Sequence, residues 1–308
     1  MTTAFVFPGQ GAQAVGMGRD LLAESAAARA IFEQADETLG FGVAKLCFDG
    51  PEDALTATEN AQPALLTVST ALLAALADST EIAPFVARTA AFVAGHSLGE
   101  YSALVAAGAL DFPTALRLVR RRGELMAAAD DGVMAAIIGL DEEPLEAVCR
   151  EAADGEALVI ANYNSPGQLV ISGASSAVER ALGLAKARGA KRALPLKVSA
   201  AFHSPLMRAA AEGLAEVVDR AAIADPRVPV ISNVSAKPLQ DADAIRAELV
   251  AQVTAPVRWI ASVRHMADTG VDRFVEVGPG TVLSGLIKRI APGAQLTNVS
   301  DLASVRSF

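Results

Sequence analysis

A serine framed by glycines is the first feature of the chain that could carry out chemistry. The segment GHSLGE, residues 95–100, follows the apolar run TAAFVA, residues 89–94. A strand, the turn Gly-x-Ser-x-Gly and a helix form a nucleophile elbow, in which a strained turn exposes the serine hydroxyl. Side chains in place of the flanking glycines would collide with the neighbouring strand or helix. We therefore interpret Ser97 as a nucleophile; the alternative is an ordinary serine in a glycine-rich turn.

A serine nucleophile needs a base, and the chain has three histidines. His203 precedes SPLM, a segment able to cap and start a helix, so it lies at a strand-to-helix junction on the edge where sites form. His96 adjoins Ser97, so its side chain should point away and make a structural hydrogen bond. His265 is expected to face solvent from its helix. His203 is therefore the predicted base.

The third member of a hydrolase triad is missing from its usual place. A hydrolase would place an acidic residue between Ser97 and His203 in the chain, and none stands out at a strand end there. A backbone carbonyl or an amide could orient the imidazole instead. Gln252 is one candidate, although the sequence by itself does not select it.

One arginine points toward the protein interior. The helix at 113–128 has an apolar stripe that includes Met126, and Arg122 falls in its middle. A buried guanidinium is usually held by an internal salt bridge, here to Glu124 or Glu100. The alternative partner is a substrate carboxylate, held by the planar guanidinium. A charge-assisted pair of about 1.5–3 kcal/mol would favour a carboxylated acyl group roughly 10- to 150-fold.

The segment FPGQGAQA, residues 7–14, permits two interpretations. It fits the G-x-G-x-x-A pattern of dinucleotide sites, but no acidic residue ends a second strand about 20 residues later. The helix after Ser97 begins near Leu98, whose free N–H and dipole end can stabilise an oxyanion. We favour Gln10 as the donor of a second oxyanion N–H, provided that the two strands are neighbours.

Short apolar runs alternate with helical patterns, which predicts an α/β fold. The runs at 3–7, 89–94, 228–233 and 273–280 each end in a loop rich in Gly, Pro or Asn. The carboxyl ends of such strands share one edge of an open sheet, where sites form. We expect a mainly parallel sheet in a large subdomain similar to the α/β-hydrolases.

Residues 131–197 break this rhythm with the order β-α-β-β-α-β, which is a ferredoxin-like unit. The expected strands are 133–140, 157–163, 167–173 and 192–198, and the helices are 143–152 and 176–189. We interpret the unit as a small subdomain inserted into a large one at 1–130 and 198–308. A length of 308 residues also favours two packed subdomains.

Composition excludes several classes of protein. Apolar residues make up 52% of the chain, which is ample for a core, and the net charge of −9 disfavours nucleic acid as a partner. Two cysteines, Cys47 and Cys149, allow at most one disulfide and favour a reducing compartment. The start lacks a signal peptide pattern, and the uncharged stretch 60–77 contains polar residues, so it predicts a buried helix. We expect a cytoplasmic protein that does not bind membranes.

Several blocks of the chain resemble the malonyl-CoA:acyl carrier protein transacylases of fatty acid synthesis, and they occur in that family's order. The blocks are FVFPGQGAQ, ENAQPALLTVS, GHSLGEYSALVAAGAL, RLVRRRGELM, IANYNSPGQLVISG, AFHSPLM, ISNV, PVRW and EVGPGTVLSGLIKR. The resemblance runs nearly end to end. It is far more specific than Gly-x-Ser-x-Gly alone.

The resemblance implies a role for each candidate residue. Ser97 would accept the acyl group, His203 would act as base with Gln252 beside it, and the oxyanion hole would be the backbone N–H groups of Gln10 and Leu98. Arg122 would bind the malonyl carboxylate, and Phe202 would exclude a 2-methyl group. Further substrate contacts are expected from Met126 and Asn162.

The implied reaction is a ping-pong transfer of malonyl from malonyl-CoA to the phosphopantetheine thiol of acyl carrier protein, without a metal or bound cofactor. The product would supply fatty acid or polyketide synthesis, and we expect a monomer. The basic runs 186–192 and 286–289 could bind coenzyme A phosphates or the carrier protein, or could simply complement helix dipoles. The rival functions are a serine esterase or thioesterase and a non-catalytic dinucleotide-binding or docking module.

Overall fold

The computed structural model describes residues 1–129, 131–196, 198 and 200–308. A six-stranded sheet lies at its centre, in the order β10-β9-β1-β2-β7-β8. The strands are β1 Thr3–Phe7, β2 Phe92–Gly95, β7 Val230–Ile231, β8 Pro238–Leu239, β9 Arg273–Val277 and β10 Gln295–Val299. All neighbours are parallel except β7 and β8. The prediction of a mainly parallel sheet is confirmed.

Helices cover both faces of this sheet because alternate strand residues face opposite sides. Along β1, Phe5 and Phe7 join the larger apolar core, whereas Ala4 and Val6 join the core on the other face. The helices around the larger core are α1 Leu21–Glu24, α2 Ala26–Leu39, α3 Val43–Asp49, α4 Glu52–Thr56, α5 Thr58–Ala77, α6 Ala83–Thr89, α7 Gly99–Ala106, α8 Phe112–Ala127, α11 Arg208–Val218, α12 Ala242–Ala251 and α15 Leu302–Ser307. Helices α13 Trp259–Asp268 and α14 Val282–Ile290 cover the opposite face.

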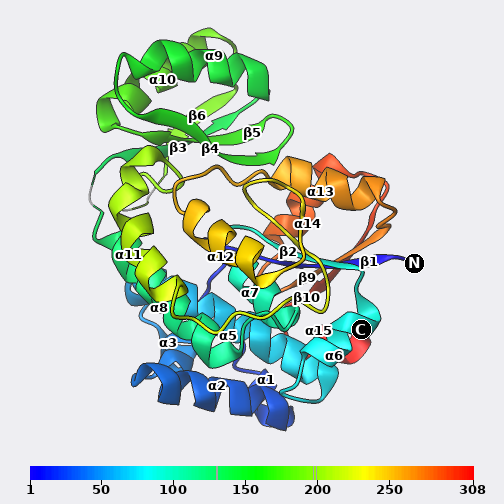
Figure 1. Ribbon diagram of the computed structural model, residues 1–308. Coiled ribbons are helices and arrows are strands. Elements are labelled where there is room, and N and C mark those ends of the chain that lie inside the picture. Colours follow the sequence, from blue (N-terminus) through cyan, green and yellow to red (C-terminus); the bar gives the residue numbers. More distant parts are fainter. Residues whose placement is uncertain (130, 197, 199) are drawn as a thin grey trace.

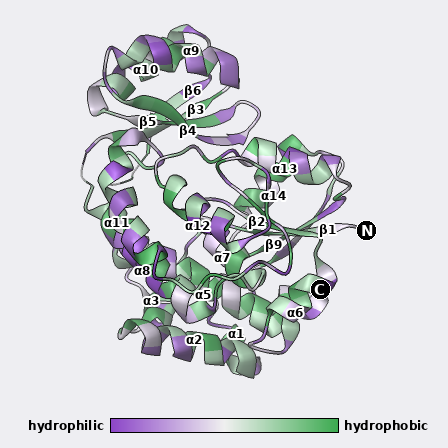
Figure 2. Cartoon of the chain, in the orientation of Figure 1, coloured by the Kyte–Doolittle hydropathy of each residue, from purple (hydrophilic) through white to green (hydrophobic). Residues whose placement is uncertain are grey.

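Helix α5 contains the uncharged stretch of the sequence. It is long and apolar enough to cross a membrane, but 78% of its most apolar window is buried inside the protein. It contacts α2, α7 and α8, and the hydrophilic colours of Figure 2 lie mainly on outer helices such as α9 and α11. Helix α5 is therefore a core helix, as predicted.

A second sheet stands apart from the first, at the top of Figure 1. Its strands are β3 Val133–Ile138, β4 Leu158–Ser165, β5 Gln168–Gly173 and β6 Arg192–Pro195, and its helices are α9 Glu142–Ala153 and α10 Ser175–Ala187. The antiparallel order β4-β5-β3-β6 has the ferredoxin-like topology that the sequence predicts. Strand β6 ends at Pro195, short of the expected residue 198.

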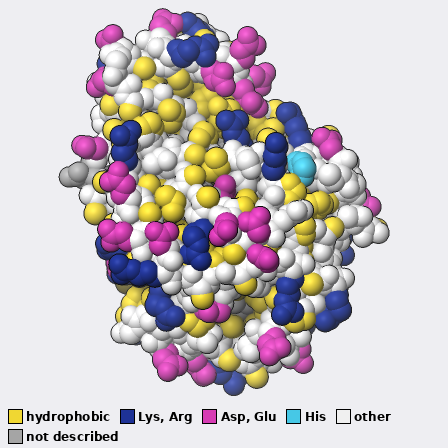
Figure 3. Space-filling view, in the orientation of Figure 1, with side chains coloured by type: hydrophobic (Ala, Val, Ile, Leu, Met, Phe, Trp, Pro, Cys, Tyr) yellow, Lys and Arg dark blue, Asp and Glu magenta, His cyan; other side chains and the backbone are white. Residues whose placement is uncertain are grey.

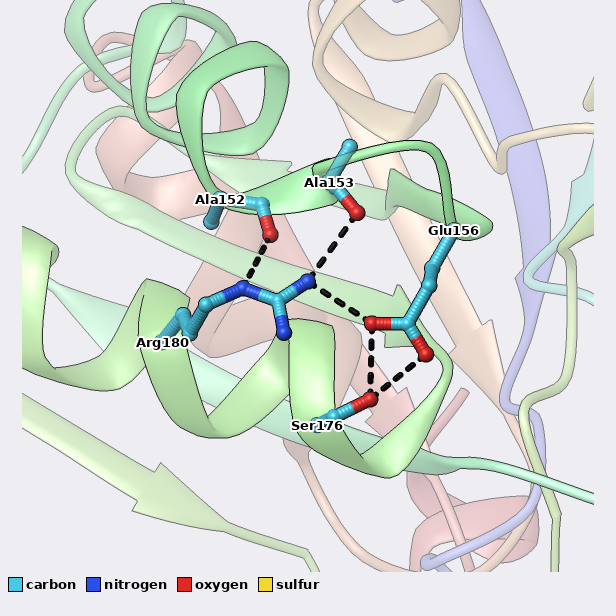
Figure 4. A network of polar contacts seen from close by, with 5 residues as sticks. All are labelled: Ala152, Ala153, Glu156, Ser176 and Arg180. Atoms are coloured by element: carbon cyan, nitrogen blue, oxygen red, sulfur yellow. Dashed lines mark hydrogen bonds and ion pairs between the residues drawn. The ribbon is translucent and has the colours of Figure 1, made fainter.

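A polar network joins the two helices of this unit (Figure 4). Arg180 of α10 donates to the carbonyls of Ala152 and Ala153 at the end of α9, at 2.8 and 3.0 Å. It also pairs with Glu156 at 2.7 Å, which in turn accepts from Ser176. The unit has its own apolar core. Asp130 and Lys197, at the expected subdomain boundaries, lie outside the described residues, so the boundaries stay predictions.

Candidate active site

The serine elbow lies between β2 and α7. Ser97 has φ of 51°, a conformation that non-glycine residues rarely adopt. Asn233 holds this turn from the loop after the neighbouring strand β7, because its Oδ1 accepts from the Ser97 N–H at 2.7 Å and its Nδ2 donates to the Gly95 carbonyl at 2.7 Å. The strained backbone is thus fixed by a side chain 136 residues away.

The two glycines of the elbow are required by close backbone approaches. A Cβ on Gly95 would lie 1.9 Å from the Gly99 carbonyl at the start of α7. A Cβ on Gly99 would lie 2.1 Å from the carbonyl oxygen of Phe7 in β1. These contacts are the collisions with helix and strand that the pattern predicts.

Ser97 and His203 form a hydrogen-bonded pair. The distance from Ser97 Oγ to His203 Nε2 is 2.8 Å. His203 Nδ1 faces the backbone carbonyls of Gln252 and Ala255, at 2.9 and 3.2 Å. Carbonyls can only accept, so Nδ1 carries the proton and Nε2 is free to accept the serine proton. The arrangement has a nucleophile, a base and an orienting group.

Gln252 orients the imidazole through its backbone and not through its side chain. The side chain turns the other way, where Nε2 donates to the carbonyl of Ser97 at 2.9 Å and to Glu100, and Oε1 accepts from Arg122 at 2.8 Å. The sequence leaves open whether a backbone carbonyl or a side-chain amide accepts from the imidazole. In the structure the acceptor is a backbone carbonyl.

His203 is neutral at physiological pH. Burial and the nearby positive charge of Arg122 lower the pKa of His203 from 6.5 to about 3, whereas the two carbonyls raise it slightly. A neutral imidazole can accept a proton at once.

This pKa shift makes the folding stability depend on pH. In the unfolded chain His203 protonates near pH 6.5, but in the folded protein only near pH 3, so its contribution is complete above 6.5 and is lost as the pH falls toward 3. Between pH 7 and 5 we expect about 2 kcal/mol of this loss. Urea unfolding of the protein and of His203→Gln at both pH values measures it. An equal pH dependence in the two proteins would contradict the shift.

Arg122 is buried and points into the site, with 1% of its surface exposed. Its Nη1 donates to Gln62 Oε1 at 2.8 Å, and its Nη2 donates to Gln252 Oε1 at 2.8 Å and to Ser97 Oγ at 3.1 Å. Its Nε has no partner among the described residues. The salt bridge considered from sequence is not found in the described part of the chain, since Glu124 pairs with Arg120 and Arg121. Three neutral oxygens accept its hydrogen bonds, and its guanidinium carbon also lies 5.7 Å from the centroid of the Tyr101 ring.

The two backbone N–H groups proposed for an oxyanion lie at one sheet edge. Strands β1 and β2 are parallel neighbours with Phe7 opposite Gly95, and the His96 N–H donates to the Phe7 carbonyl at 3.0 Å. Gln10 and Leu98 follow these strands, and neither N–H has an acceptor within the described residues. The first helix after β1 begins only at Leu21, so the GQG turn does not open a helix as a dinucleotide site would.

A cavity of about 140 Å³ joins the predicted substrate residues to the reactive pair. Met126, Asn162 and Phe202 all line it, and each is buried. The other predicted residues that line it are Gln10, Ser97, Leu98, Arg122 and His203. Gln252 is the one predicted site residue that does not line the cavity.

The other two histidines are structural. His96 Nε2 bonds to Asn164 Oδ1 at 2.8 Å and its ring contacts Trp259, as predicted for a side chain that points away from Ser97. His265 is half-buried with its ring against Phe92, so the prediction that it faces solvent is wrong.

Sequence reasoning missed three kinds of site residue. Gln62, which accepts from Arg122, is one of several polar residues in α5, so the sequence does not single it out. Asn233, which clamps the elbow, ends an apolar run. Leu196 and Val198 line the cavity without any distinguishing pattern.

No group of three metal-binding side chains occurs among the residues that the structure describes. Cys47 and Cys149 are free and buried in different cores. Burial raises the pKa of each thiol to about 12, so neither is a reactive thiolate.

A serine hydroxyl hydrogen-bonded to a neutral imidazole, near two backbone N–H groups without an acceptor among the described residues, is the arrangement typical of acyl-transferring enzymes of the serine class. Comparison with known proteins also indicates an acyltransferase. Residues 4–305 match the family model of the acyl transferase domain. A malonyl CoA-acyl carrier protein transacylase of Bacillus subtilis is 49% identical over 302 residues, which are 97% of this chain and 93% of that protein.

Two solved structures are similar over the whole chain. An acyl-carrier-protein S-malonyltransferase of Bartonella henselae has a TM-score of 0.96 at 43% identity, covering 100% of this chain and 98% of that one. A malonyl-transacylase in complex with a type II PKS acyl-carrier protein has a TM-score of 0.94 at 44% identity, with the same coverage. The chain therefore belongs to the malonyl CoA-acyl carrier protein transacylase family.

Proposed function

We propose that this protein transfers a malonyl group from malonyl-CoA to the phosphopantetheine thiol of an acyl carrier protein, through a malonyl ester on Ser97. The observation that carries the proposal is the buried Arg122 guanidinium, which lies 3.1 Å from the Ser97 hydroxyl and has no acidic partner among the described residues. A carboxylate at the far end of the acyl group would supply that partner. The relatives' names point to the same substrate pair.

The reaction has two matched halves. His203 Nε2 takes the Ser97 proton as Oγ attacks the thioester carbonyl. The carbonyl oxygen, which becomes negatively charged, accepts hydrogen bonds from the backbone N–H groups of Gln10 and Leu98. The C–S bond then breaks, and the imidazolium returns its proton to the coenzyme A sulfur. In the second half the carrier thiol gives its proton to His203 and attacks the ester, and Ser97 leaves with that proton. One thioester replaces another, so the transfer is reversible and nearly thermoneutral.

Mass spectrometry of the intact protein separates this function from its rivals. After malonyl-CoA is added, we expect an adduct of one malonyl group that is stable for many turnover times in water and is discharged when holo carrier protein is added. A thioesterase would release malonate without any thiol acceptor. A binding module would form no adduct, and either result would overturn the proposal.

Phe202 is the proposed selector against branched acyl groups. It is 6% exposed and lines the cavity beside His203. A 2-methyl group would overlap the ring, so Phe202→Ser should partly admit methylmalonyl-CoA while still using malonyl-CoA. The rate ratio for the two substrates checks this, and an unchanged ratio would remove Phe202 from the selection.

The carrier protein and the phosphates of coenzyme A both bring negative charge. Lys288 and Arg289 are exposed in the last turn of α14, and Arg289 donates to Gln168 of the small sheet. On the face shown in Figure 3, Lys and Arg side chains stand on both sides of a hydrophobic band below the small sheet. We propose that the surface where α14 meets the small sheet is the docking face for the carrier protein and the coenzyme A phosphates. The alternative is that these basic residues only complement the helix dipole. If the carrier protein docks on this face, Lys288→Ala should slow the transfer of malonyl from Ser97 to the carrier protein. If Lys288 only complements the helix dipole, the rate of this transfer should not change.

We also propose that the protein is a cytoplasmic monomer built from subdomains 1–130 with 198–308 and 131–197. Light scattering at micromolar concentration tests the monomer, because a second species of twice the mass would exclude it. Fractionation of cells tests the location, since recovery with the membranes would contradict it.

A further inference from the structure

Two buried carboxyl groups lie behind the catalytic elbow and take no part in the reaction proposed above. Glu100, in the first turn of α7, is fully buried, and Glu248, in α12, is 7% exposed. They are hydrogen-bonded to each other. Neither forms a salt bridge within the described residues. Two such groups at one site cannot both be ionised without a large cost, so they must share a proton.

Burial raises the pKa of both carboxyl groups, and it raises that of Glu100 further. The pKa of Glu248 is lowered in part by the hydrogen bonds that it accepts from Ser232 Oγ at 2.7 Å and from the Val234 N–H at 3.0 Å. Burial and the charge of Glu248 raise the pKa of Glu100 well above its usual range. Glu100 is therefore the neutral acid, and it donates its proton to the Glu248 carboxylate.

Both oxygens of Glu100 also accept hydrogen bonds. One accepts from the Asn233 N–H at 3.2 Å, and the other accepts from Gln252 Nε2. A carboxylic acid can accept at both oxygens and still donate one proton, which an amide cannot do. The site therefore requires an acid at this position and would not tolerate an amide equally well.

The hydrogen bond between Glu100 and Gln252 determines which end of the Gln252 amide faces Arg122. With Nε2 held by Glu100 and by the Ser97 carbonyl, the amide oxygen is left to accept from the Arg122 guanidinium at 2.8 Å. A flipped amide would set its NH₂ group against a cation that can only donate. Glu100 thus determines one of the neutral acceptors on which the position of Arg122 depends.

We propose that Glu100 is a positioning residue for selection of the acyl group: through the Gln252 amide it holds Arg122 where the substrate carboxylate must bind. This inference rests on the proposed function of Arg122. It assigns a role to the final residue of GHSLGE, which the elbow pattern itself does not explain.

Two isosteric variants separate positioning from packing. In Glu100→Gln one oxygen acceptor becomes a donor, so the contact to Gln252 or to Asn233 is lost. In Glu248→Gln the new amide can donate to Glu100, which then ionises and keeps both of its acceptor roles, whereas the contact of residue 248 to Ser232 or to Val234 is lost. Each variant removes one carboxyl from the same buried pair. A role in packing alone predicts similar effects for the two.

The measurement is the ratio of kcat/KM for malonyl-CoA to that for acetyl-CoA in loading Ser97. We expect the ratio to fall about tenfold in Glu100→Gln, mainly through a higher KM for malonyl-CoA, and to stay within about twofold of the original protein in Glu248→Gln. The ratio cancels any difference in the fraction of folded protein. An equal fall in both variants, or an unchanged ratio in both Glu100→Gln and Gln252→Ala, would overturn the proposal.

Gln252→Ala keeps the test decisive if Glu100→Gln does not fold. Removal of the amide should lower the same ratio, and Glu100→Gln should add nothing further in that background, because both act on one contact. A ratio that stays at the original value in Gln252→Ala would refute the mechanism. Failure of the proposed function itself is recognised separately, because the unmodified protein would then form no malonyl adduct.

Discussion

Ser97→Ala is expected to abolish the malonyl adduct and to lower the transfer rate by several orders of magnitude, on the order of 10⁶-fold as for other serine nucleophiles. The hydroxyl is the sole group placed between the base at 2.8 Å and the guanidinium at 3.1 Å, so no neighbour can replace it within the described site. Malonyl-CoA should still bind, because Arg122 and the cavity remain. Intact mass after incubation with malonyl-CoA measures the adduct directly.

Ser102→Ala is the matched control for this substitution. Ser102 lies on helix α7, which follows the elbow, is 2% exposed, and its hydroxyl has no partner among the described residues. Its replacement should leave both the adduct and the transfer rate close to those of the unmodified protein. A malonyl adduct that persisted in Ser97→Ala would place the nucleophile elsewhere and contradict the whole site.

Arg122→Ala is expected to lower the preference for malonyl-CoA over acetyl-CoA by roughly 10- to 150-fold. Acetyl has no carboxylate, so its loading should change much less. The loss should appear in kcat/KM for malonyl-CoA, since the pair between guanidinium and carboxylate forms on binding. Removal of the positive charge should also raise the pKa of His203, which that charge holds down.

Arg121→Ala tests whether the effect comes from charge in general. Arg121 is the preceding residue, with 48% of its side chain exposed and a contact of 3.6 Å to Glu124. An exposed pair of this kind contributes little, so the selectivity should stay near its original value. If Arg122→Ala accepted malonyl-CoA as well as the unmodified protein does, the carboxylate argument would be wrong.

The local parts of the site could be predicted because they depend on neighbours in the chain. The glycines at 95 and 99 are demanded by a turn of five residues, and the inward direction of Arg122 follows from the helical period of 3.6 residues. The alternation of strands and helices likewise predicted both sheets, because patterns of period 2 and 3.6 reflect which face is buried.

The partners of these residues could not be predicted from the chain because they come from distant segments. The carbonyl that orients His203 belongs to a residue 49 positions away, and the amide that binds Arg122 is 130 positions away. A backbone carbonyl carries no signature in the amino-acid type, so Gln252 could be named only as a candidate. The solvent-facing prediction for His265 failed for a related reason, since its own helix does not reveal that β2 lies against it.

The sequence by itself determined the two-sheet architecture, the elbow and the one arginine that turns inward, and it predicted His203 as the base. Only the tertiary structure decided that the arginine meets neutral oxygens, that the imidazole is held by main-chain carbonyls, and that two carboxyl groups are buried together behind the elbow. The physical reason is that side-chain periodicity reports which surfaces are buried. Hydrogen-bond partners and pKa shifts depend on which buried surfaces meet, and that is settled by packing across the whole chain.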